Sequence, residues 1–294
     1  MHRFRCSAIL GFNSWRTDDS LRWRYVSVVL LLLAFTSTGS TQYAEFVRAG
    51  RPGQAMGTYA VGNQVLQFEQ GVTLQRQTLD AFTGEGDQLD VTSLTNNNVI
   101  RYGLAERWEV SSVVVVQRAE VVEPQVDAKS ETGISIRQVR GRYGWTKESD
   151  QLPSIAVQLG WLIPWDSEVF TRKNSGFTLQ TSIGKSVTEW LSLTANVGMT
   201  NAGNEDGTKG FYVGAASFSV SDKLSVLVEG YGRFEPFDVN VDAGLAYTVN
   251  PRLQLDALYG RQGFGQFEGD LPALDDDWFL SVGASYRFVW RDKN

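Results

Sequence analysis

The sequence predicts an all-β protein, an up-and-down antiparallel transmembrane β-barrel of about twelve strands. Three observations predict this class. Apolar and polar residues alternate with a period of two along most of the chain, the connections between these segments alternate between short and long, and aromatic residues gather at the segment ends. Beyond residue 40, no stretch is apolar enough to form a membrane helix.

The first forty residues have the features of an export signal. Arg22 and Arg24 precede the apolar run 26–35, and the small residues 36–40 follow it. Ten helical residues rise only about 15 Å, whereas a bilayer core is about 30 Å thick, so we expect cleavage after Ser40 rather than a membrane anchor. The predicted organisation is a signal peptide at 1–40, a periplasmic N-terminal segment at 41–62 and an outer-membrane barrel at 63–294.

Composition excludes several classes of function. His2 and Cys6 are the only histidine and cysteine, and both precede the expected cleavage site. The remaining 254 residues hold 22 basic and 31 acidic side chains, a net charge of −9. This leaves no disulfide framework, no Cys/His metal site and no histidine general base, and it argues against a nucleic-acid partner. We therefore expect no cofactor and no bound metal.

The strands follow from the alternation. In the run 66–74, for example, Leu66, Phe68, Val72 and Leu74 alternate with polar residues or glycine. The twelve predicted strands are 63–76, 95–105, 108–118, 132–143, 153–163, 176–185, 190–199, 210–220, 224–231, 237–248, 253–260 and 277–290. Two of them are ambiguous. In 132–143 the apolar face switches after Ile136, which a β-bulge would explain, and in 210–220 both faces are fairly apolar.

The connections predict two unlike ends. Those at 105–107, 186–189, 221–223 and 249–252 are tight turns, and 144–152 is somewhat longer. The other set is mostly long: 77–94, 119–131, 164–175, 200–209, the short 232–236, and 261–276. Outer-membrane barrels place short turns in the periplasm and long loops outside, and an even strand number leaves both termini in the periplasm.

Alternation alone also fits a soluble β-sandwich or a lipocalin-like barrel, in which the apolar face points inward. Three features favour a membrane barrel: a polar face of Gly, Ser, Thr, Gln and Asn with Lys185 as its only strand lysine, aromatic residues at both strand ends, and a mean hydropathy of −0.21, too low for a helical membrane protein. The aromatic residues expected at the long-loop end include Phe211 and Tyr231. The aromatic girdles are predicted to contain Trp108, Trp161, Trp190, Tyr247, Tyr259, Trp278, Phe288 and Trp290.

The same alternation assigns charged residues to the inner face. The predicted pore-lining set is Glu69, Arg101, Glu109, Arg137, Glu229, Asp238, Asp242, Asp256 and Arg287. Its acidic members lie mostly on the ninth to eleventh predicted strands and its arginines on the second, fourth and twelfth. Opposed walls of this kind would create a transverse field that orients polar solutes. The alternative is that these charges are buried, pair with one another and brace a narrow lumen.

Several segments resemble an outer-membrane transporter family named for a meta-pathway of phenol degradation. They are Arg51-Pro-Gly53 followed by Val65-Leu-Gln-Phe-Glu-Gln-Gly71, the run 101–110, the turn Phe218–Leu224 with Glu229, and the closing Gly283-Ala-Ser-Tyr-Arg-Phe288. The resemblance covers nearly all of 51–290. It implies a barrel that moves small compounds, often aromatic or hydrophobic, across the outer membrane. The C-terminus departs from the usual barrel ending, since Trp290 and four polar residues follow Phe288.

These features predict an outer-membrane channel for the passive passage of small solutes, including aromatic or hydrophobic compounds. The expected partners are outer-membrane lipid and lipopolysaccharide, the solute and the barrel-insertion machinery. The alternatives are a plugged structural or adhesive barrel without transport and an outer-membrane hydrolase, which would lack the usual histidine base. The outer loops carry 18 acidic and 6 basic residues, and Asp270 with Asp275, Asp276 and Asp277 is a weak candidate for divalent cations.

Overall fold

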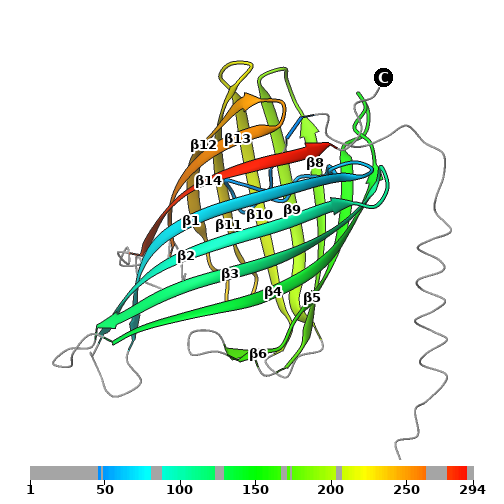
Figure 1. Cartoon of the computed structure of the whole chain (residues 1–294). Coiled ribbons are helices and arrows are strands. Elements are labelled where there is room, and N and C mark those ends of the chain that lie inside the picture. The colour runs from blue at the N-terminus through cyan, green and yellow to red at the C-terminus, as the bar shows by residue number, and fades with distance from the viewer. Residues whose placement is uncertain are drawn as a thin grey trace, which may run out of the picture. The chain divides into compact units, whose positions relative to one another are not determined.

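The computed structural model contains a closed barrel of twelve antiparallel strands (Figure 1). It describes residues 46–47, 49–80, 88–122, 129–166, 171–172, 174–202, 207–262 and 277–289. The export-signal prediction at 1–40 and Trp290 therefore lie outside the described residues, as do Asp270, Asp275 and Asp276. Within the described part of the chain, no helix is long and apolar enough to cross a membrane.

Every predicted strand is present, with shifted ends. The barrel strands are β1 (Val65–Asp80), β2 (Gln88–Gly103), β3 (Trp108–Val122), β4 (Lys129–Thr146), β5 (Ser154–Leu162), β8 (Gly176–Ser186), β9 (Leu191–Ala202), β10 (Lys209–Ser219), β11 (Leu224–Arg233), β12 (Asn240–Asn250), β13 (Leu253–Arg261) and β14 (Trp278–Val289). Each strand pairs with its neighbours in sequence, and β14 closes the barrel on β1. The loop after β5 adds a small hairpin of β6 (Trp165–Asp166) and β7 (Thr171–Arg172).

The β-bulge predicted after Ile136 is confirmed. Val113 pairs with Gln138 and Val114 pairs with Ile136, so Arg137 is the extra residue on β4. The bulge moves the inward positions of β4 from odd to even numbers, because side chains alternate with a period of two. Ser135 is buried before the bulge and Arg142 after it.

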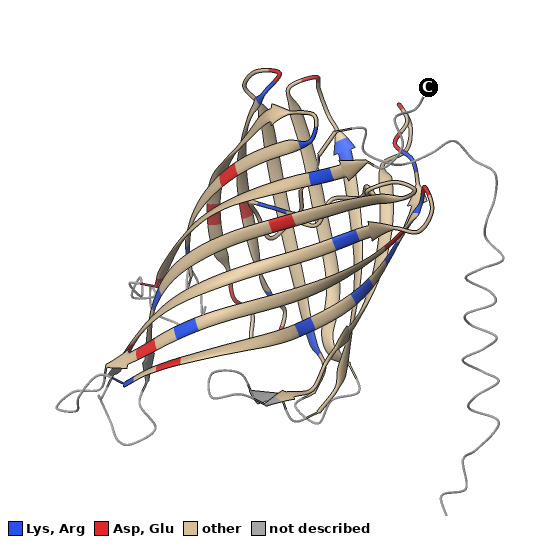
Figure 2. Cartoon of the chain, viewed as in Figure 1, with Lys and Arg blue, Asp and Glu red and all other residues tan. Residues whose placement is uncertain are grey.

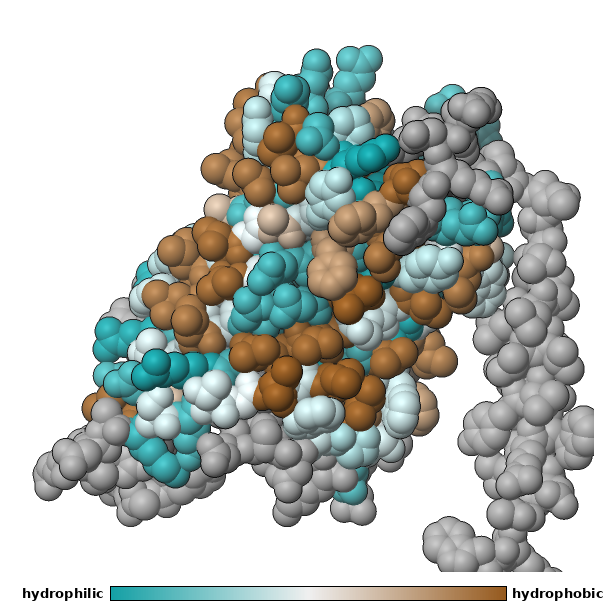
Figure 3. All heavy atoms as spheres, viewed as in Figure 1, coloured by the Kyte–Doolittle hydropathy of each residue, from teal (hydrophilic) through white to brown (hydrophobic). Residues whose placement is uncertain are grey.

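The outer surface is apolar over most of its area, as a membrane requires. Large hydrophobic side chains are exposed on every barrel strand except β10, for example Leu94, Leu159, Val197 and Leu245. They form the brown regions of the surface in Figure 3. The interior is polar, with Gln67, Ser182, Asn196 and Ser285 buried. This inside-out distribution identifies a transmembrane barrel rather than a soluble one.

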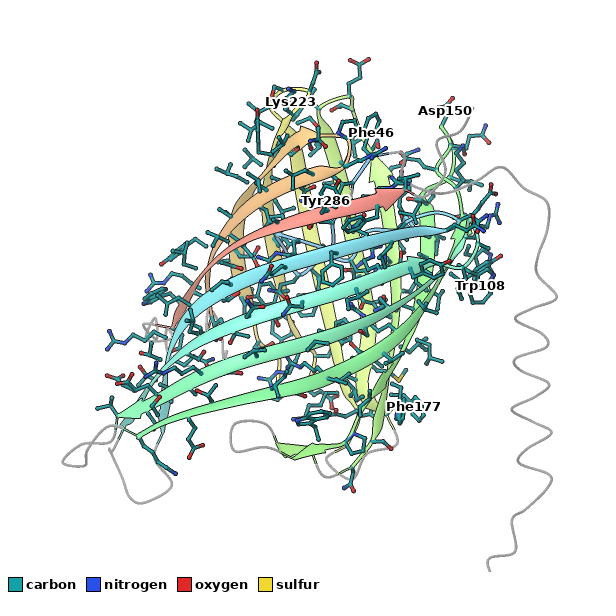
Figure 4. All side chains as sticks on the ribbon, in the orientation of Figure 1. Phe46, Trp108, Asp150, Phe177, Lys223 and Tyr286 are labelled. Atoms are coloured by element: carbon teal, nitrogen blue, oxygen red, sulfur yellow. The ribbon has the colours of Figure 1, made fainter. Side chains whose placement is uncertain are left out.

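The two ends differ as predicted. The turns after β2, β8, β10 and β12 are short, and together with the longer connection after β4 they define what we call the short-turn end. Trp108 and Lys223 lie at this end, and Phe177 lies at the opposite, long-loop end (Figure 4). Strands β1 to β4 have 15 to 18 residues, whereas the other barrel strands have 9 to 12.

The segment before β1 does not lie outside the barrel. The described residues 49–61 run inside the barrel and bond its inner wall, where they appear in blue in Figure 1. We call residues 49–61 the collar. Buried side chains of the wall supply hydrogen-bond partners to the collar backbone, which accounts for this placement.

Candidate functional site: a lumen with an internal collar

The barrel lumen is the candidate site, and its wall has the predicted polar character. Seven of the nine predicted pore-lining residues are buried on the inner wall: Glu69, Arg101, Glu109, Glu229, Asp242, Asp256 and Arg287. The other two are elsewhere. Arg137 is exposed at the bulge of β4, and Asp238 lies in the turn before β12.

Asp238 caps this turn rather than lining the lumen. Its carboxylate accepts hydrogen bonds from the backbone N–H of Arg233 and from the Arg233 guanidinium, with Nε to Oδ2 at 3.0 Å. The predicted strand 237–248 therefore begins three residues too early, because Phe237 and Asp238 belong to the turn that closes on the β11 end.

Two further arginines line the lumen and were missed. Arg140 and Arg142 occupy inward positions on β4, because Arg140 pairs with the buried Ser111 and Arg142 with the buried Glu109. The Arg142 guanidinium donates to Gln158 at 3.3 Å. The sequence contains the signal for both, because the bulge predicted after Ile136 moves the inward positions of this strand to even numbers.

Arg101 is the centre of a buried ion-pair network. Its Nη1 lies 2.7 Å from the Glu69 carboxylate and its Nε lies 2.8 Å from the Glu109 carboxylate. Gln67 also donates to Glu69 at 2.7 Å. The side chains of Arg101, Glu69 and Glu109 are at most 5 % exposed. These charges therefore face one another and the collar rather than open water.

The collar begins on the β1 side of the barrel. The N–H of Gly50 donates to Glu69 on β1 at 3.1 Å. The Arg51 guanidinium then bonds Asp256 on β13 at 3.2 Å and Ser281 on β14 at 2.7 Å. Further along, the N–H of Ala55 donates to Glu229 on β11 at 2.9 Å, and the N–H of Gln54 donates to the same carboxylate.

The collar continues around the wall in the same direction. The backbone N–H and C=O of Met56 both bond the amide of Asn196 on β9, at 2.6 and 2.9 Å. The hydroxyl of Thr58 lies 2.8 Å from that of Ser154 on β5. Arg142 on β4 donates to the carbonyl of Tyr59 at 3.1 Å, and Glu109 on β3 accepts from the N–H of Val61 at 3.0 Å.

These partners follow the order of strands in the closed barrel, from β1 past β14, β13, β11, β9, β5 and β4 to β3. The collar therefore makes one circuit of the inner wall. Arg287 on β14 completes it by donating to the carbonyl of Val61 at 3.1 Å. The chain then turns sharply into β1, with positive φ angles at Gly62 and Gln64.

Glycines on the inner wall make room for the collar. Gly71 and Gly283 face each other on β1 and β14, and a Cβ at either would fall within 2.4 Å of the Arg51 guanidinium. A Cβ on Gly103 would fall 1.7 Å from the backbone oxygen of Gly62. The wall is thus shaped to hold this segment, since contacts this short are not found for real Cβ atoms.

An open cavity of about 660 Å³ lies between the collar and the short-turn end. Its wall on β8 to β12 is made mostly of small polar or apolar side chains, including Ser192, Thr194, Ser217, Ser225 and Thr248, with Lys185 and Glu229 as its charged members. Most collar residues between Ala49 and Tyr59 contribute to the lining together with Arg101 and Arg142. The cavity therefore occupies the part of the lumen between the collar and the short-turn end.

The charges of the lumen are divided between two sides. Glu229, Asp242 and Asp256 lie on β11, β12 and β13, whereas Arg101, Arg140 and Arg142 lie on β2 and β4 (Figure 2). In the closed strand order β12 and β4 are six strands apart, which places them across the barrel from each other. The separation is incomplete, because Glu69 and Glu109 pair with Arg101 on the basic side and Arg51 pairs with Asp256 on the acidic side, so the transverse field stays a prediction.

The predicted girdle residues that the structure describes lie on the outer face near the two barrel ends. Trp161, Trp190, Tyr247, Tyr259 and Phe288 are between 42 and 55 % exposed. Trp108 packs on Tyr143 with ring centroids 4.6 Å apart, and Trp190 stacks on Phe218 at 6.2 Å. Trp278 begins β14 at the long-loop end on the same outward set of positions as Leu280.

Two aromatic residues expected near the long-loop interface face inward instead. Phe211 pairs with Gly198, and a Cβ on Gly198 would touch the Phe211 ring. Tyr231 pairs with the buried Val213 on the inner wall. The ambiguous strand 210–220 caused the first error, because both of its faces are apolar and neither parity stands out.

Asp277 is the one described member of the acidic cluster at 270–277. Its carboxylate accepts a hydrogen bond from the backbone N–H of Thr78 at 2.7 Å, which ties the end of that loop to β1. The residues that the structure describes contain no group of three or more acidic, histidine or cysteine side chains placed to hold a metal ion.

Comparison with solved structures supports the fold. The chain is similar to the COG4313 outer membrane channel from Pseudomonas putida F1, with 9 % identity and a TM-score of 0.55 over 82 % of this chain and 100 % of that one. It is also similar to the KdgM porin, with 11 % identity and a TM-score of 0.46 over 76 % of this chain and 99 % of that one. A comparison with curated proteins finds no match.

A family profile matches this chain and agrees with the family resemblance found in the sequence. The profile described as "Putative MetA-pathway of phenol degradation" matches residues 49–266. The matched range covers well over half of the chain and includes the whole collar as well as β1 to β13. The chain therefore belongs to this family of outer-membrane barrels, and the collar lies within the family's shared region.

Proposed function

We propose that the protein is a passive outer-membrane channel for small solutes whose narrowest part is the collar. The observation that carries this proposal is the hydrophilic lumen, which opens at the short-turn end into a cavity of about 660 Å³. A structural barrel needs no such cavity, and polar wall residues such as Ser192 and Thr194 are suited to contact with water and solute.

Aromatic or hydrophobic solutes are the finer part of the proposal. On the long-loop side of the charged residues, the inner wall carries Phe211, Val213, Tyr231, Leu258 and Phe279. The Phe279 ring contacts Gly260, where a Cβ would fall 2.2 Å from the ring. A lumen with a charged zone and a ring-lined zone suits solutes that carry both an aromatic and a polar part.

The collar supports a second candidate, a plugged barrel that does not transport. Its backbone groups are bonded by side chains of at least six strands, so it could close the lumen completely. An enzymatic role has weaker support, since the chain after His2 contains no histidine and the buried acidic groups Glu69 and Glu109 are bound to Arg101.

Conductance in planar bilayers tests the proposal. We expect the purified protein to give small current steps, and we expect a variant that lacks residues 46–59 to give larger ones, because the collar takes up space in the lumen. If the intact protein gives no current and the shortened variant conducts, the plugged barrel is correct. If neither conducts although both are folded, as judged by heat-modifiable migration on gels, the channel proposal is wrong.

A further inference from the structure

A polar patch interrupts the lipid-facing surface. On the outer face of β1, β2 and β3, the side chains of Gln70, Asn96, Asn98 and Ser112 point outward with the hydrophobic residues around them. We call these four residues the amide patch. Figure 3 shows a hydrophilic area over β1 and β2 in the middle of the hydrophobic surface.

The amide patch lies at the centre of the apolar belt. On β1 the outward residues Leu66 and Phe68 precede Gln70, and Val72 and Leu74 follow it. On β2 the outward Leu94 and Tyr102 bracket the two asparagines. A membrane strand needs about 9 to 11 residues to cross the hydrocarbon, so the amides lie near mid-depth, far from either interface.

The other barrel strands have no carboxamide at the centre of their described outward faces. Apart from Arg137, exposed at the bulge of β4, their central outward residues are apolar or small, such as Val157, Ala195, Val228 and Ala257, and Thr181 is the one hydroxyl among them. A threonine can bond its own backbone. The amides are therefore a local feature of one side of the barrel.

Amides in hydrocarbon are costly unless they are bonded. Moving an unbonded amide from water to an alkane costs about 4–8 kcal/mol. Within the patch, the Asn98 amide donates to Asn96 Oδ1 at 2.6 Å, which uses one donor and one acceptor. Each primary amide has two N–H donors and an oxygen that accepts, so most of the hydrogen-bonding capacity of the patch is unused by this contact.

We propose that the amide patch is the contact surface of a homodimer in the membrane, formed when two barrels face each other through β1, β2 and β3. Carboxamides carry donors and acceptors in equal measure, so the patch is complementary to a second copy of itself. A two-fold axis near Gln70 and Asn98 would bring the same residues together from both copies. Ala284, the neighbour of Gln70 on β14, is small enough to allow close approach.

Cross-linking in native outer membranes tests this inference. In a Cys6→Ser background, which removes the only cysteine, Val72→Cys places a thiol beside the patch, since Val72 pairs with Asn96. The matched control is Val197→Cys on β9, an exposed residue six strands away on the opposite wall. We expect a bismaleimide to cross-link Val72→Cys to a band of twice the barrel mass, several-fold more than the control.

A second variant connects the cross-link to the amides. Gln70→Leu, Asn96→Leu and Asn98→Leu combined should leave a folded, heat-modifiable barrel, because leucine is favoured on the lipid face, and should abolish the dimer band. The inference is wrong if the leucine variant still cross-links, if both thiol positions cross-link equally, or if the product contains a different protein. Conductance is measured separately, so this result does not depend on the channel proposal.

Discussion

At the residue scale, Arg101 shows how buried charge is used in this barrel. It bridges two carboxylates at 2.7 and 2.8 Å, and both of them also bond the collar backbone. Pore-lining charges were expected to contact solute, but these contact protein. The alternation of the sequence predicts which residues face inward, yet it cannot distinguish a side chain that faces water from one that faces another segment.

Replacing Arg101 is expected to destabilise the barrel strongly. Arg101→Met leaves Glu69 and Glu109 buried without their cation, and breaking a buried pair in this way costs about 3–5 kcal/mol. The matched control is Arg76→Met. Arg76 pairs with Asp90 on the surface, where the two side chains are 49 and 48 % exposed, so loss of this ion pair should cost about 0–1 kcal/mol. Urea unfolding in lipid vesicles, followed by tryptophan fluorescence, measures both; equal losses would contradict the buried network.

At the scale of elements, the sequence predicts the strands better than the collar. All twelve strands and the bulge on β4 follow from alternation and turn spacing. The ends of β1 to β4 do not, because these strands continue past the apolar belt, where residues such as Arg118 and Glu120 hide the periodic pattern. The collar has no periodicity at all, and the wall side chains that bond it come from distant parts of the sequence.

Glycine substitutions test whether the wall is shaped around the collar. Gly103→Ala places a Cβ 1.7 Å from the backbone oxygen of Gly62, which cannot move without shifting the collar's exit into β1. Gly141→Ala on β4 is the matched control, since nothing lies within 4 Å of its Cβ. We expect the first variant to lower the temperature at which the barrel unfolds on gels and the second to leave it unchanged.

A collar that lies elsewhere would make the two alanine variants behave alike.

A disulfide gives an independent check of the position of the collar. In the Cys6→Ser background, Thr58→Cys combined with Ser154→Cys should oxidise readily, since the two native hydroxyl oxygens are 2.8 Å apart. Either single variant should give no intramolecular product.

At the scale of the whole molecule, charged side chains of both signs line different parts of the lumen wall. Acidic residues on β11 to β13 face basic residues on β2 and β4, and the collar brings Arg51 to the acidic side. Asp256 pairs with Arg51, and Glu229 accepts hydrogen bonds from the collar backbone. Among the described residues, Asp242 is the member of this acidic wall whose carboxylate has neither an ion pair nor a collar hydrogen bond. Its charge should therefore have the largest effect on passing ions.

Asp242→Asn is expected to shift the reversal potential under a salt gradient towards anion preference. The substitution keeps size and hydrogen bonding while it removes one negative charge from the lumen. The shift should shrink with salt, since the Debye length falls from about 10 Å at 0.1 M to about 3 Å at 1 M. Asp238→Asn is the control, because Asp238 is held by Arg233 in the turn before β12. If both variants shift the potential equally, or neither does, ions do not pass the acidic wall, and the conducting path must lie elsewhere in the barrel.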